Sequence, residues 1–345
     1  MTKYVKRPYA VERILDHFPG LTPDHIVRHL KYSTFVSVAR RYMYFAVPKA
    51  ACTQMKELLR TVESAPPVRL FADGARQTRR DMFIHARSNV PLPSLADLDD
   101  RAQREVLEAP DFLRMTVVRN PYTRLVSAWR NKIFLCEPQT IHLYLQIKGG
   151  LPGVHEKSLV SFEEFVEYLE SKCDLSTCDA HWRWQINHTF LRAMRFSLIV
   201  KVEQMTDGLR QFQQHLGLSD YLPANGRNAS VPFGSSPYSK ELADRVYSLY
   251  RRDFEVLGYD RNTWPAGREN GSEQLGKACV TEERLCDEII ERNLIIADLY
   301  EERERLQAQL NAQLRRLSRL HLLSIIDGLV AFRSMWRKVA RDLKG

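Results

Sequence analysis

The stretch that decides the fold is "YFAVPKAACTQMKELLR", residues 44–60, in which an apolar run ends in Pro-Lys and passes through small residues into a helical pattern. The aromatic and β-branched run predicts a buried strand, and the residues after the turn predict a helix. A turn of this kind directs the N–H groups of the first helical turn at whatever lies above it. Because the positive end of the helix dipole favours an anion there, the stretch predicts an anion-binding loop.

Two side chains of this loop have the chemistry that an anionic group requires. Lys49 neutralises a phosphate-like charge, and Thr53 offers a hydroxyl at the start of the helix. Ala50 and Ala51 are small and leave room for close approach. The loop lacks the GxxxxGK[ST] pattern of nucleoside triphosphatases, so ATP hydrolysis is not its natural prediction. Taken alone, the stretch is also compatible with an ordinary turn that carries an exposed lysine.

A second strand–turn–helix pattern occupies residues 113–134, "LRMTVVRNPYTRLVSAWRNKIF". Its apolar run ends at Val118, and Pro121 breaks it. Arg119 leaves the end of the strand, and Ser127 lies on the helix that follows. An arginine and a hydroxyl in this arrangement converge on a second phosphate. Two anion sites at the ends of two strands of one sheet indicate a ligand with phosphates at both ends of a nucleoside.

Strands and helices continue to alternate toward residue 260. Residues 196–203 predict a third buried strand, and helices are expected at residues 161–171, 204–217 and 239–259. The alternation predicts an α/β fold, with a P-loop-like central parallel β-sheet flanked by helices on both faces. Residues 65–81 are rich in proline, glycine and arginine and predict a loop.

The first 38 residues contain two short helical patterns and are expected to form an N-terminal helical extension, residues 1–38. Helix boundaries are marked by particular residues in this region and beyond it. Thr22 is an expected N-cap, Ser161 with Glu164 an expected capping box, and Gly217 an expected helix stop.

The composition changes after Tyr259. Residues 261–281 predict a linker, so the α/β domain is expected over residues 39–260. The remaining residues, 282–345, begin with a leucine and isoleucine heptad that predicts a coiled coil through which the protein forms homo-oligomers. The alternative is a helix folded back on the α/β domain. The last part is apolar and then basic, which suits either a peripheral contact with an acidic membrane surface or completion of the coiled coil.

Bulk composition sets only wide limits on function. The 345 residues are 44% hydrophobic and 27% charged, which is typical of a globular protein with one large domain and an appendage. The net charge of +9 favours an anionic partner without selecting nucleic acid, acidic glycan or membrane. Six scattered cysteines form no CxxC pair, which argues against a zinc ribbon. The sequence has no recognisable signal peptide or transmembrane stretch, so we expect a cytoplasmic or membrane-peripheral protein.

The two loops carry a resemblance to a known family. "VPKAACTQMK" and "VVRNPYTRLVSAWRNK" resemble the 5′-phosphosulfate and 3′-phosphate segments of carbohydrate sulfotransferases that use 3′-phosphoadenosine 5′-phosphosulfate (PAPS), most closely the chondroitin/dermatan type. The similarity continues in order through "FEEFVEYL", the pair His181–Trp182, "VKVEQM" and "VYSLYRRDFEVLGY". It covers about residues 42–259. The members of this type are Golgi membrane enzymes, so the resemblance extends only to their catalytic domain.

The resemblance implies roles for the loop residues. Lys49 lies near the bridging oxygen of the phosphosulfate and Thr53 on the 5′-phosphate, within a cradle formed by Ala50, Ala51, Cys52, Thr53 and Gln54. Arg119 and Ser127 hold the 3′-phosphate, which distinguishes PAPS from ATP. Arg227 lies on a loop that related enzymes close over the nucleotide. Arg124 and Arg130 are expected to bind the donor or an acidic glycan, or to be structural.

The reaction implied is in-line transfer of a sulfuryl group to a sugar hydroxyl, and the scheme needs no metal. It does need a general base near neutrality. His85 lies between the two donor segments, where related enzymes carry a histidine that acts on the acceptor. His181 belongs to the family His-Trp pair and is the second candidate, and Glu203 is the third.

Two other functions compete with this interpretation. A P-loop-type nucleotide phosphotransferase has nearly the same fold, but the missing Walker A pattern and the pair Arg119 and Ser127 argue against it. A non-catalytic scaffold or nucleic-acid-binding protein would use the basic surface, yet the sequence has no recognised nucleic-acid motif, so no nucleic-acid partner is predicted. The identity of the carbohydrate acceptor, and of its hydroxyl, is left open.

Overall fold

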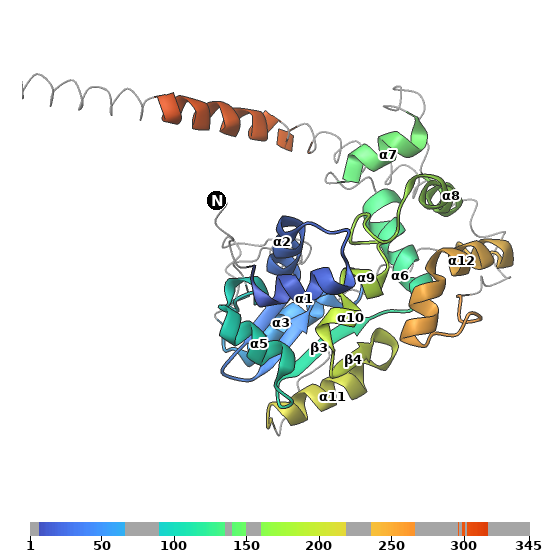
Figure 1. Ribbon diagram of the computed structural model, residues 1–345. Helices are drawn as coiled ribbons and strands as arrows, with labels where there is room; N and C mark the ends of the chain where they lie inside the picture. Colours follow the sequence, from blue (N-terminus) through green and yellow to red (C-terminus); the bar gives the residue numbers. More distant parts are fainter. Residues whose placement is uncertain are drawn as a thin grey trace, which may run out of the picture.

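The structure is a computed structural model of the 345-residue chain (Figure 1). It describes residues 7–65, 90–134, 140–149, 160–218, 236–265, 296, 299–300 and 302–316. Nearly all of the predicted loop at 65–81, most of the predicted linker and most of the C-terminal tail lie outside the described residues.

A four-stranded sheet in the order β1-β2-β3-β4 forms the centre of the molecule. Its strands are β1 (Thr34–Ser37), β2 (Tyr42–Phe45), β3 (Leu113–Val118) and β4 (Leu198–Lys201). Strand β2 pairs parallel with β3, and β3 pairs parallel with β4. The three strands predicted from sequence are therefore adjacent and parallel, so the two predicted anion loops leave neighbouring strands at the same edge of the sheet.

The sheet is mixed, which corrects the expectation of a purely parallel one. Strand β1 runs antiparallel to β2, with Thr34 opposite Phe45 and Ser37 opposite Tyr42. We expected residues 1–38 to be helical, and the last part of that stretch instead forms this edge strand. All four residues of β1 are buried. A strand so short, with a hydroxyl residue at each end, has no alternation of apolar and polar residues that would reveal it in the sequence.

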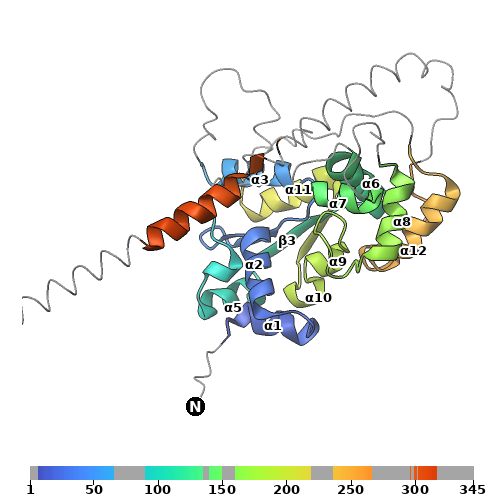
Figure 2. The same cartoon turned by 90° about the horizontal axis from the view of Figure 1, so that it is seen from above.

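Alternate residues of β2 point to opposite faces of the sheet, and each face is covered by its own helices, as predicted. On one face Met43 and Phe45 pack in a cluster with residues of α1, α2, α5 and α10. On the other face Tyr42 and Tyr44 pack with residues of α3 and α11. Figure 2 shows α3 and α11 on one side of β3 and α1, α5 and α10 on the other. These helices are α1 (Tyr9–His17), α2 (Pro23–Ser33), α3 (Cys52–Val62), α5 (Asp100–Glu108), α10 (Leu191–Met194) and α11 (Met205–His215).

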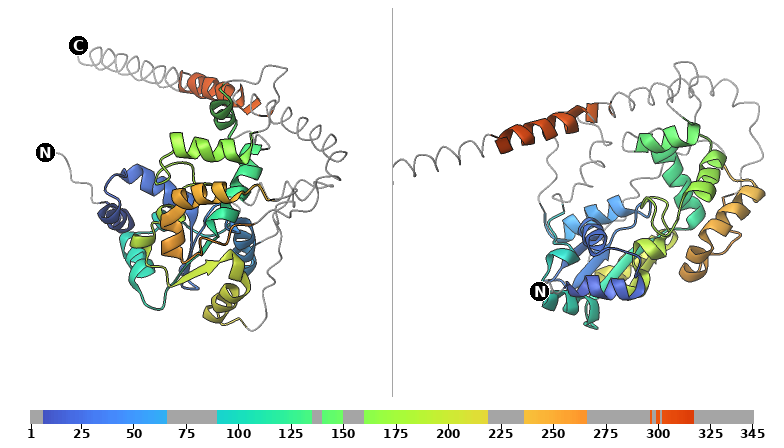
Figure 3. Two further views of the ribbon diagram at one scale, coloured as in Figure 1. Left: turned by 90° about the vertical axis from the view of Figure 1, so that its right-hand side faces the viewer. Right: turned by 45° about the horizontal axis from the view of Figure 1, so that its top comes forward.

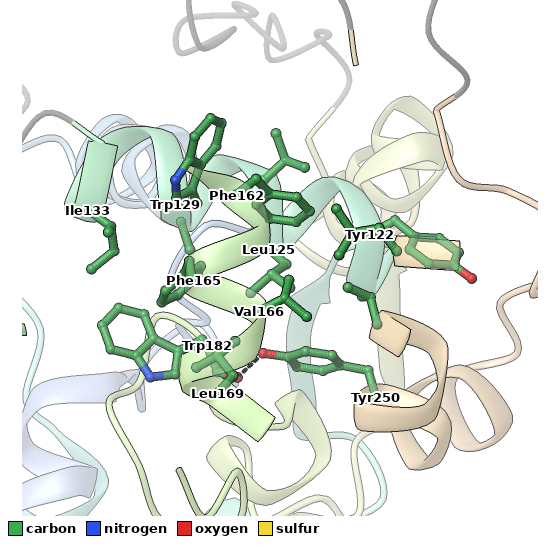
Figure 4. Close-up of a cluster of buried hydrophobic side chains, with 14 of the residues drawn as sticks. Tyr122, Leu125, Trp129, Ile133, Phe162, Phe165, Val166, Leu169, Trp182 and Tyr250 are labelled. Carbon is green, nitrogen blue, oxygen red and sulfur yellow. Dashed lines mark hydrogen bonds between the residues drawn. The ribbon is translucent and has the colours of Figure 1, made fainter. Parts of the chain in front are cut away.

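A further apolar cluster lies beside the sheet and joins the remaining helices. Figure 4 shows its centre, where Phe165 lies close to Trp182 and the hydroxyl of Tyr250 donates to the carbonyl oxygen of Trp182 at 2.6 Å. The elements that contribute are α6 (Pro121–Ala128), the π-helical turn η3 (Trp129–Phe134), α7 (Ile141–Lys148), α8 (Phe162–Lys172) and α12 (Lys240–Leu257). The body also contains the short elements η2 (Leu95–Asp97), α9 (Gln185–His188) and η5 (Val202–Gln204).

The predicted helix boundaries are confirmed where the structure describes them. Thr22 caps α2 by accepting the N–H of His25, and Ser161 and Glu164 form the capping box of α8. Gly217 takes the left-handed φ of 65° just after α11, a conformation that glycine adopts without strain. The third predicted strand differs from expectation in one respect. It is the edge strand β4, and Ile199 is 41% exposed rather than buried.

The described part of the C-terminal tail is helical over residues 302–316, and Figure 3 shows it projecting from the α/β body. Leu306 and Leu310, which occupy heptad core positions in the sequence, are 52% and 49% exposed. Within the described ranges, none of the helices has the length and apolar character needed to cross a membrane.

Candidate active site

The loop after β2 has the backbone geometry of an anion cradle although it contains no glycine. Lys49 and Ala51 both have positive φ, 66° and 55°, a conformation that residues with a side chain rarely adopt. The N-cap residue of α3, Ala51, makes no side-chain cap hydrogen bond, and the first turn contains no acidic residue. Thr53 lies in that first turn. The start of α3 therefore keeps the electrostatic character that favours an anion.

The side chain of Lys49 reaches across to the second strand–turn–helix unit. Its Nζ donates a hydrogen bond to Oδ1 of Asn131 in η3. Arg119 in turn contacts the first unit: its Nη1 donates to the carbonyl oxygen of Lys49 at 3.3 Å. The two residues that the sequence placed at opposite ends of one ligand therefore meet at one site.

Arg119 is held against the face of α6 that carries Ser127. Its Nε donates to Oγ1 of Thr123 at 3.0 Å, and Ser127 follows Thr123 by one helical turn. Both hydroxyl residues are half-buried. Burial lowers the pKa of Arg119, partly opposed by the charge of Glu203, and an arginine guanidinium in a protein remains a cation. The predicted pairing of Arg119 and Ser127 is thus geometrically possible.

The backbone of Arg119 is fixed by a buried network from α12. The side-chain amide of Gln185 accepts from the N–H of Arg119 at 2.9 Å and donates to its carbonyl oxygen at 2.8 Å. Asp253 in turn accepts the backbone N–H groups of Gln185 and Ile186 at 2.8 and 3.1 Å. Sequence reasoning missed Gln185 and Asp253, because nothing in a sequence indicates which amide will meet which strand end.

Arg124 has a structural role, one of the two alternatives left open by the sequence. It is 1% exposed and donates to the carbonyl oxygens of Pro48, Ala180 and Arg183 at 3.1, 2.8 and 2.9 Å. These carbonyls flank Lys49 on one side and His181 on the other. A single guanidinium therefore joins the anion loop to the segment that carries the candidate base.

His181 is paired with a carboxylate that sequence reasoning did not single out. Oδ1 of Asp179 lies 2.7 Å from Nδ1 of His181 and accepts the backbone N–H of the same residue at 2.8 Å. An ionised Asp179 fixes the tautomer with the proton on Nδ1 and leaves Nε2 as the acceptor. Within the described part of the chain, Nε2 has no hydrogen-bond partner.

The pKa of His181 is lowered from its ordinary value of 6.5. Burial is the largest cause, Asp179 opposes it, and the positive charges of Lys132 and Lys49 lower the pKa further. The imidazole is therefore neutral at neutral pH, which a general base requires. The influence of Lys49 also indicates that the histidine and the anion loop belong to one electrostatic environment.

Three other residues were predicted at the site from the sequence. His85 and Arg227 lie outside the described residues, so their assignments stay predictions. Glu203 has a structural role, since it accepts hydrogen bonds from the N–H of Asn120 at 3.0 Å and from the hydroxyl of Tyr259 at 3.1 Å. In the described ranges there is no group of three or more histidine, cysteine or acidic residues arranged to hold a metal ion.

Comparisons with known proteins agree with this geometry. A sulfotransferase family model matches residues 32–260. Carbohydrate sulfotransferase 10 of Pongo abelii is 22% identical over 284 residues, covering 75% of this chain and 76% of the relative. Carbohydrate sulfotransferase 11 of Danio rerio is 24% identical over 262 residues, covering 69% of each chain. No solved structure gives a significant match.

The chain belongs to the sulfotransferase family. The matched region begins at the end of α2, includes both anion loops and all four strands, and ends just after α12. The family resemblance inferred from "VPKAACTQMK" and "VVRNPYTRLVSAWRNK" is confirmed.

Proposed function

We propose that the donor of this sulfotransferase is PAPS and that its nucleotide lies across the ends of β2 and β3. The 5′-phosphosulfate lies on the open N-terminus of α3 beside Lys49, within the cradle of residues 50–54. Arg119 and Ser127 bind the 3′-phosphate. The observation that carries the proposal is the hydrogen bond from Arg119 to the carbonyl oxygen of Lys49, since it brings both anion-binding residues to one site.

The acceptor that we propose is a hydroxyl group of a carbohydrate. The relatives named above are carbohydrate sulfotransferases, and the sequence motifs resemble the chondroitin/dermatan type. Acceptor oxygen attacks sulfur while the bond from sulfur to the phosphate oxygen breaks, which releases adenosine 3′,5′-bisphosphate. Negative charge grows on that phosphate oxygen, so Lys49 and the α3 N-terminus stabilise the transition state more than the ground state. No step of this scheme requires a metal ion.

His181 is suited to take the proton of the acceptor hydroxyl. Asp179 orients its ring and retains the proton on Nδ1, which leaves Nε2 to accept the new one. Asp179 thereby acts as a positioning residue. His85 remains the other candidate for the base.

Replacing Asp179 and His181 separately tests this assignment through the pH dependence of sulfate transfer. Because a base must be deprotonated, the rate falls as the pH drops through the lowered pKa of His181. Asp179 raises that pKa. Asp179→Asn should therefore move this low-pH fall of the rate, the acid limb of the pH profile, to lower pH, and should also lower the rate itself. His181→Ala removes the limb. An unchanged limb in His181→Ala would assign the base to another residue, with His85 tested next.

Calorimetric titration of the full chain with adenosine 3′,5′-bisphosphate and with ATP tests the donor. We expect tight binding of the bisphosphate, weak binding of ATP, and transfer of radiolabelled sulfate from PAPS to a glycan fraction. Tight binding of ATP alone would favour the nucleotide phosphotransferase instead.

We also propose that the C-terminal helix mediates homo-oligomerisation. Leu306 and Leu310 are exposed on the described segment, where a coiled coil would bury them. Light scattering of the full chain measures the mass, and Leu306→Glu with Leu310→Glu should reduce it to that of the monomer. A mass equal to the monomer in the unchanged protein would refute the coiled coil. The membrane contact of the basic C-terminus and the cytoplasmic location stay predictions.

A further inference from the structure

A cavity of 330 Å³ lies between α7, α8 and the segment that leads to His181. Its volume is at the small end of the roughly 300–1,000 Å³ that ligand sites occupy. Leu143 and Tyr168 form apolar parts of its wall, and Thr177, Asp179 and Trp182 line the side of the 173–182 segment. None of these residues belongs to the donor cradle.

The indole of Trp182 distinguishes this cavity from an ordinary packing defect. Trp129 and Trp184 donate their indole N–H groups to the carbonyl oxygens of Val160 and Leu249 at 2.9 and 2.8 Å. Trp182 is only 1% exposed, yet among the described residues its indole N–H finds no acceptor. Figure 4 shows its nitrogen on the side away from Phe165. This N–H is not among the enclosed polar atoms that lack a partner, so it is open to the cavity that Trp182 lines, and a ligand there would supply its acceptor.

Asp179 connects the cavity to the candidate base. Its Oδ1 is occupied by His181, while Oδ2 has no partner among the described residues. The side chain is 41% exposed, so Oδ2 is accessible to solvent and to a ligand. Desolvation opposes ionisation of this carboxyl, but hydrogen bonds from His181 and the positive charge of Lys132 hold its pKa below the ordinary range. A carboxylate oxygen and an indole N–H, set against the ring of Tyr168, are an acceptor, a donor and an apolar surface. Sugar rings present complementary hydroxyl groups and C–H faces.

The cavity lies on the Nδ1 side of His181, because that is the nitrogen that Asp179 contacts. The reacting hydroxyl must instead lie on the Nε2 side. We infer that the cavity binds a pyranose ring of the acceptor other than the ring that receives sulfate, through hydrogen bonds to Asp179 and Trp182. This inference rests on the proposed function and deepens it, because it makes the preferred acceptor an oligosaccharide rather than a monosaccharide.

The test places a large side chain at the exposed rim of the cavity so that it blocks the space. Thr177 and Ser176 are neighbours, and both donate their hydroxyl groups to Asp174, at 3.0 and 2.6 Å, but only Thr177 lines the cavity. Thr177→Trp blocks the cavity, and Ser176→Trp is its matched control. Saturation-transfer NMR of the full chain measures binding of a panel of neutral disaccharides, including N-acetylated ones. Calorimetry measures the affinity of the same proteins for adenosine 3′,5′-bisphosphate, which reports on the donor site.

We expect at least one disaccharide to bind the unchanged protein. Its affinity should fall about ten-fold in Thr177→Trp, as expected when hydrogen bonds to a ligand are lost, and stay unchanged in Ser176→Trp. Trp182→Phe, which removes the N–H and keeps an aromatic ring, should weaken the same disaccharide. The subsite is refuted if no disaccharide binds, or if the two tryptophan variants bind equally well. Failure of the bisphosphate to bind would refute the proposed donor instead, whatever the disaccharides do.

Discussion

The two strand–turn–helix units that meet at the site begin their helices in opposite ways. After β2, the chain turns through left-handed Lys49 and Ala51, and Ala51, the N-cap of α3, makes no side-chain cap hydrogen bond. After β3, Asn120 caps α6 by accepting the N–H of Tyr122 at 3.0 Å, and Pro121 occupies the first turn. The first unit therefore offers backbone N–H groups and a lysine to an anion. The second closes its own N-terminus and offers only the side chains of Arg119 and Ser127.

This difference matches what each end of the proposed donor does during the reaction. Charge on the 5′ side changes as the bond to sulfur breaks, so groups preorganised there accelerate the reaction. The 3′-phosphate keeps its charge throughout, and a bidentate arginine binds it equally well before and after transfer. The open helix should therefore govern turnover, and the capped helix should govern donor recognition.

The largest effect is expected from Lys49→Ala. Loss of this cation removes stabilisation of the leaving phosphate, and turnover with radiolabelled PAPS should fall about 1,000-fold. Lys31→Ala is the control, since Lys31 is an exposed lysine of α2 that pairs with Asp97 at 3.8 Å. A loss of less than ten-fold, about 1.4 kcal/mol, would remove Lys49 from the reaction.

A charge placed at the open N-terminus tests the first unit directly. Ala51→Asp should stabilise free protein slightly, by about 0.3–1 kcal/mol, because a carboxylate favours a helix N-terminus. The same carboxylate should weaken binding of adenosine 3′,5′-bisphosphate about 100-fold through repulsion of the 5′-phosphate. Ala51→Asn, which also tolerates positive φ, is the neutral control. Calorimetry and thermal unfolding measure the two effects, and equal donor binding by both variants would contradict the cradle.

The smallest effect is expected at the capped helix. Asn120→Ala should lower the free energy of unfolding by about 1 kcal/mol, measured by urea denaturation, because α6 loses its cap. Affinity for the bisphosphate should stay within about two-fold, less than 0.5 kcal/mol, since this N-terminus does not meet the ligand. Asn120→Ser retains a capping oxygen and should recover most of the stability. If Asn120→Ala lost donor affinity as Ala51→Asp does, the two helices would not differ as described.

Much of this arrangement was predictable because strand ends and helix starts leave local signals. The strands at 42–45 and 113–118, and the meeting of Lys49 with Arg119, follow from pattern and from the rule that parallel strands share one edge. The capping box of α8 is equally local. Strand β1 was missed, because pairing with β2 rather than its own pattern makes it a strand.

What the sequence did not reveal depends on contacts between distant segments. Arg124 lies on the helix of the second unit but binds the carbonyl oxygens of Pro48 and Arg183 in two other segments, so its motif position suggested a ligand as readily as a structural bond. The sequence contains only a weak indication that Asp179 pairs with His181, namely an acid two residues before a histidine. That spacing can be interpreted only once the burial of the histidine and the positions of the nearby lysines are known.

The most direct measurement compares adenosine 3′,5′-bisphosphate with adenosine 5′-phosphate, which differ only in the group that Arg119 is proposed to bind. The unchanged protein should prefer the bisphosphate about 100-fold, roughly 2.7 kcal/mol. In Arg119→Ala the two affinities should become nearly equal, while binding of the 5′-phosphate itself changes little. If Arg119→Ala kept the full preference, the 3′-phosphate would lie elsewhere and the two strand ends would not share one nucleotide.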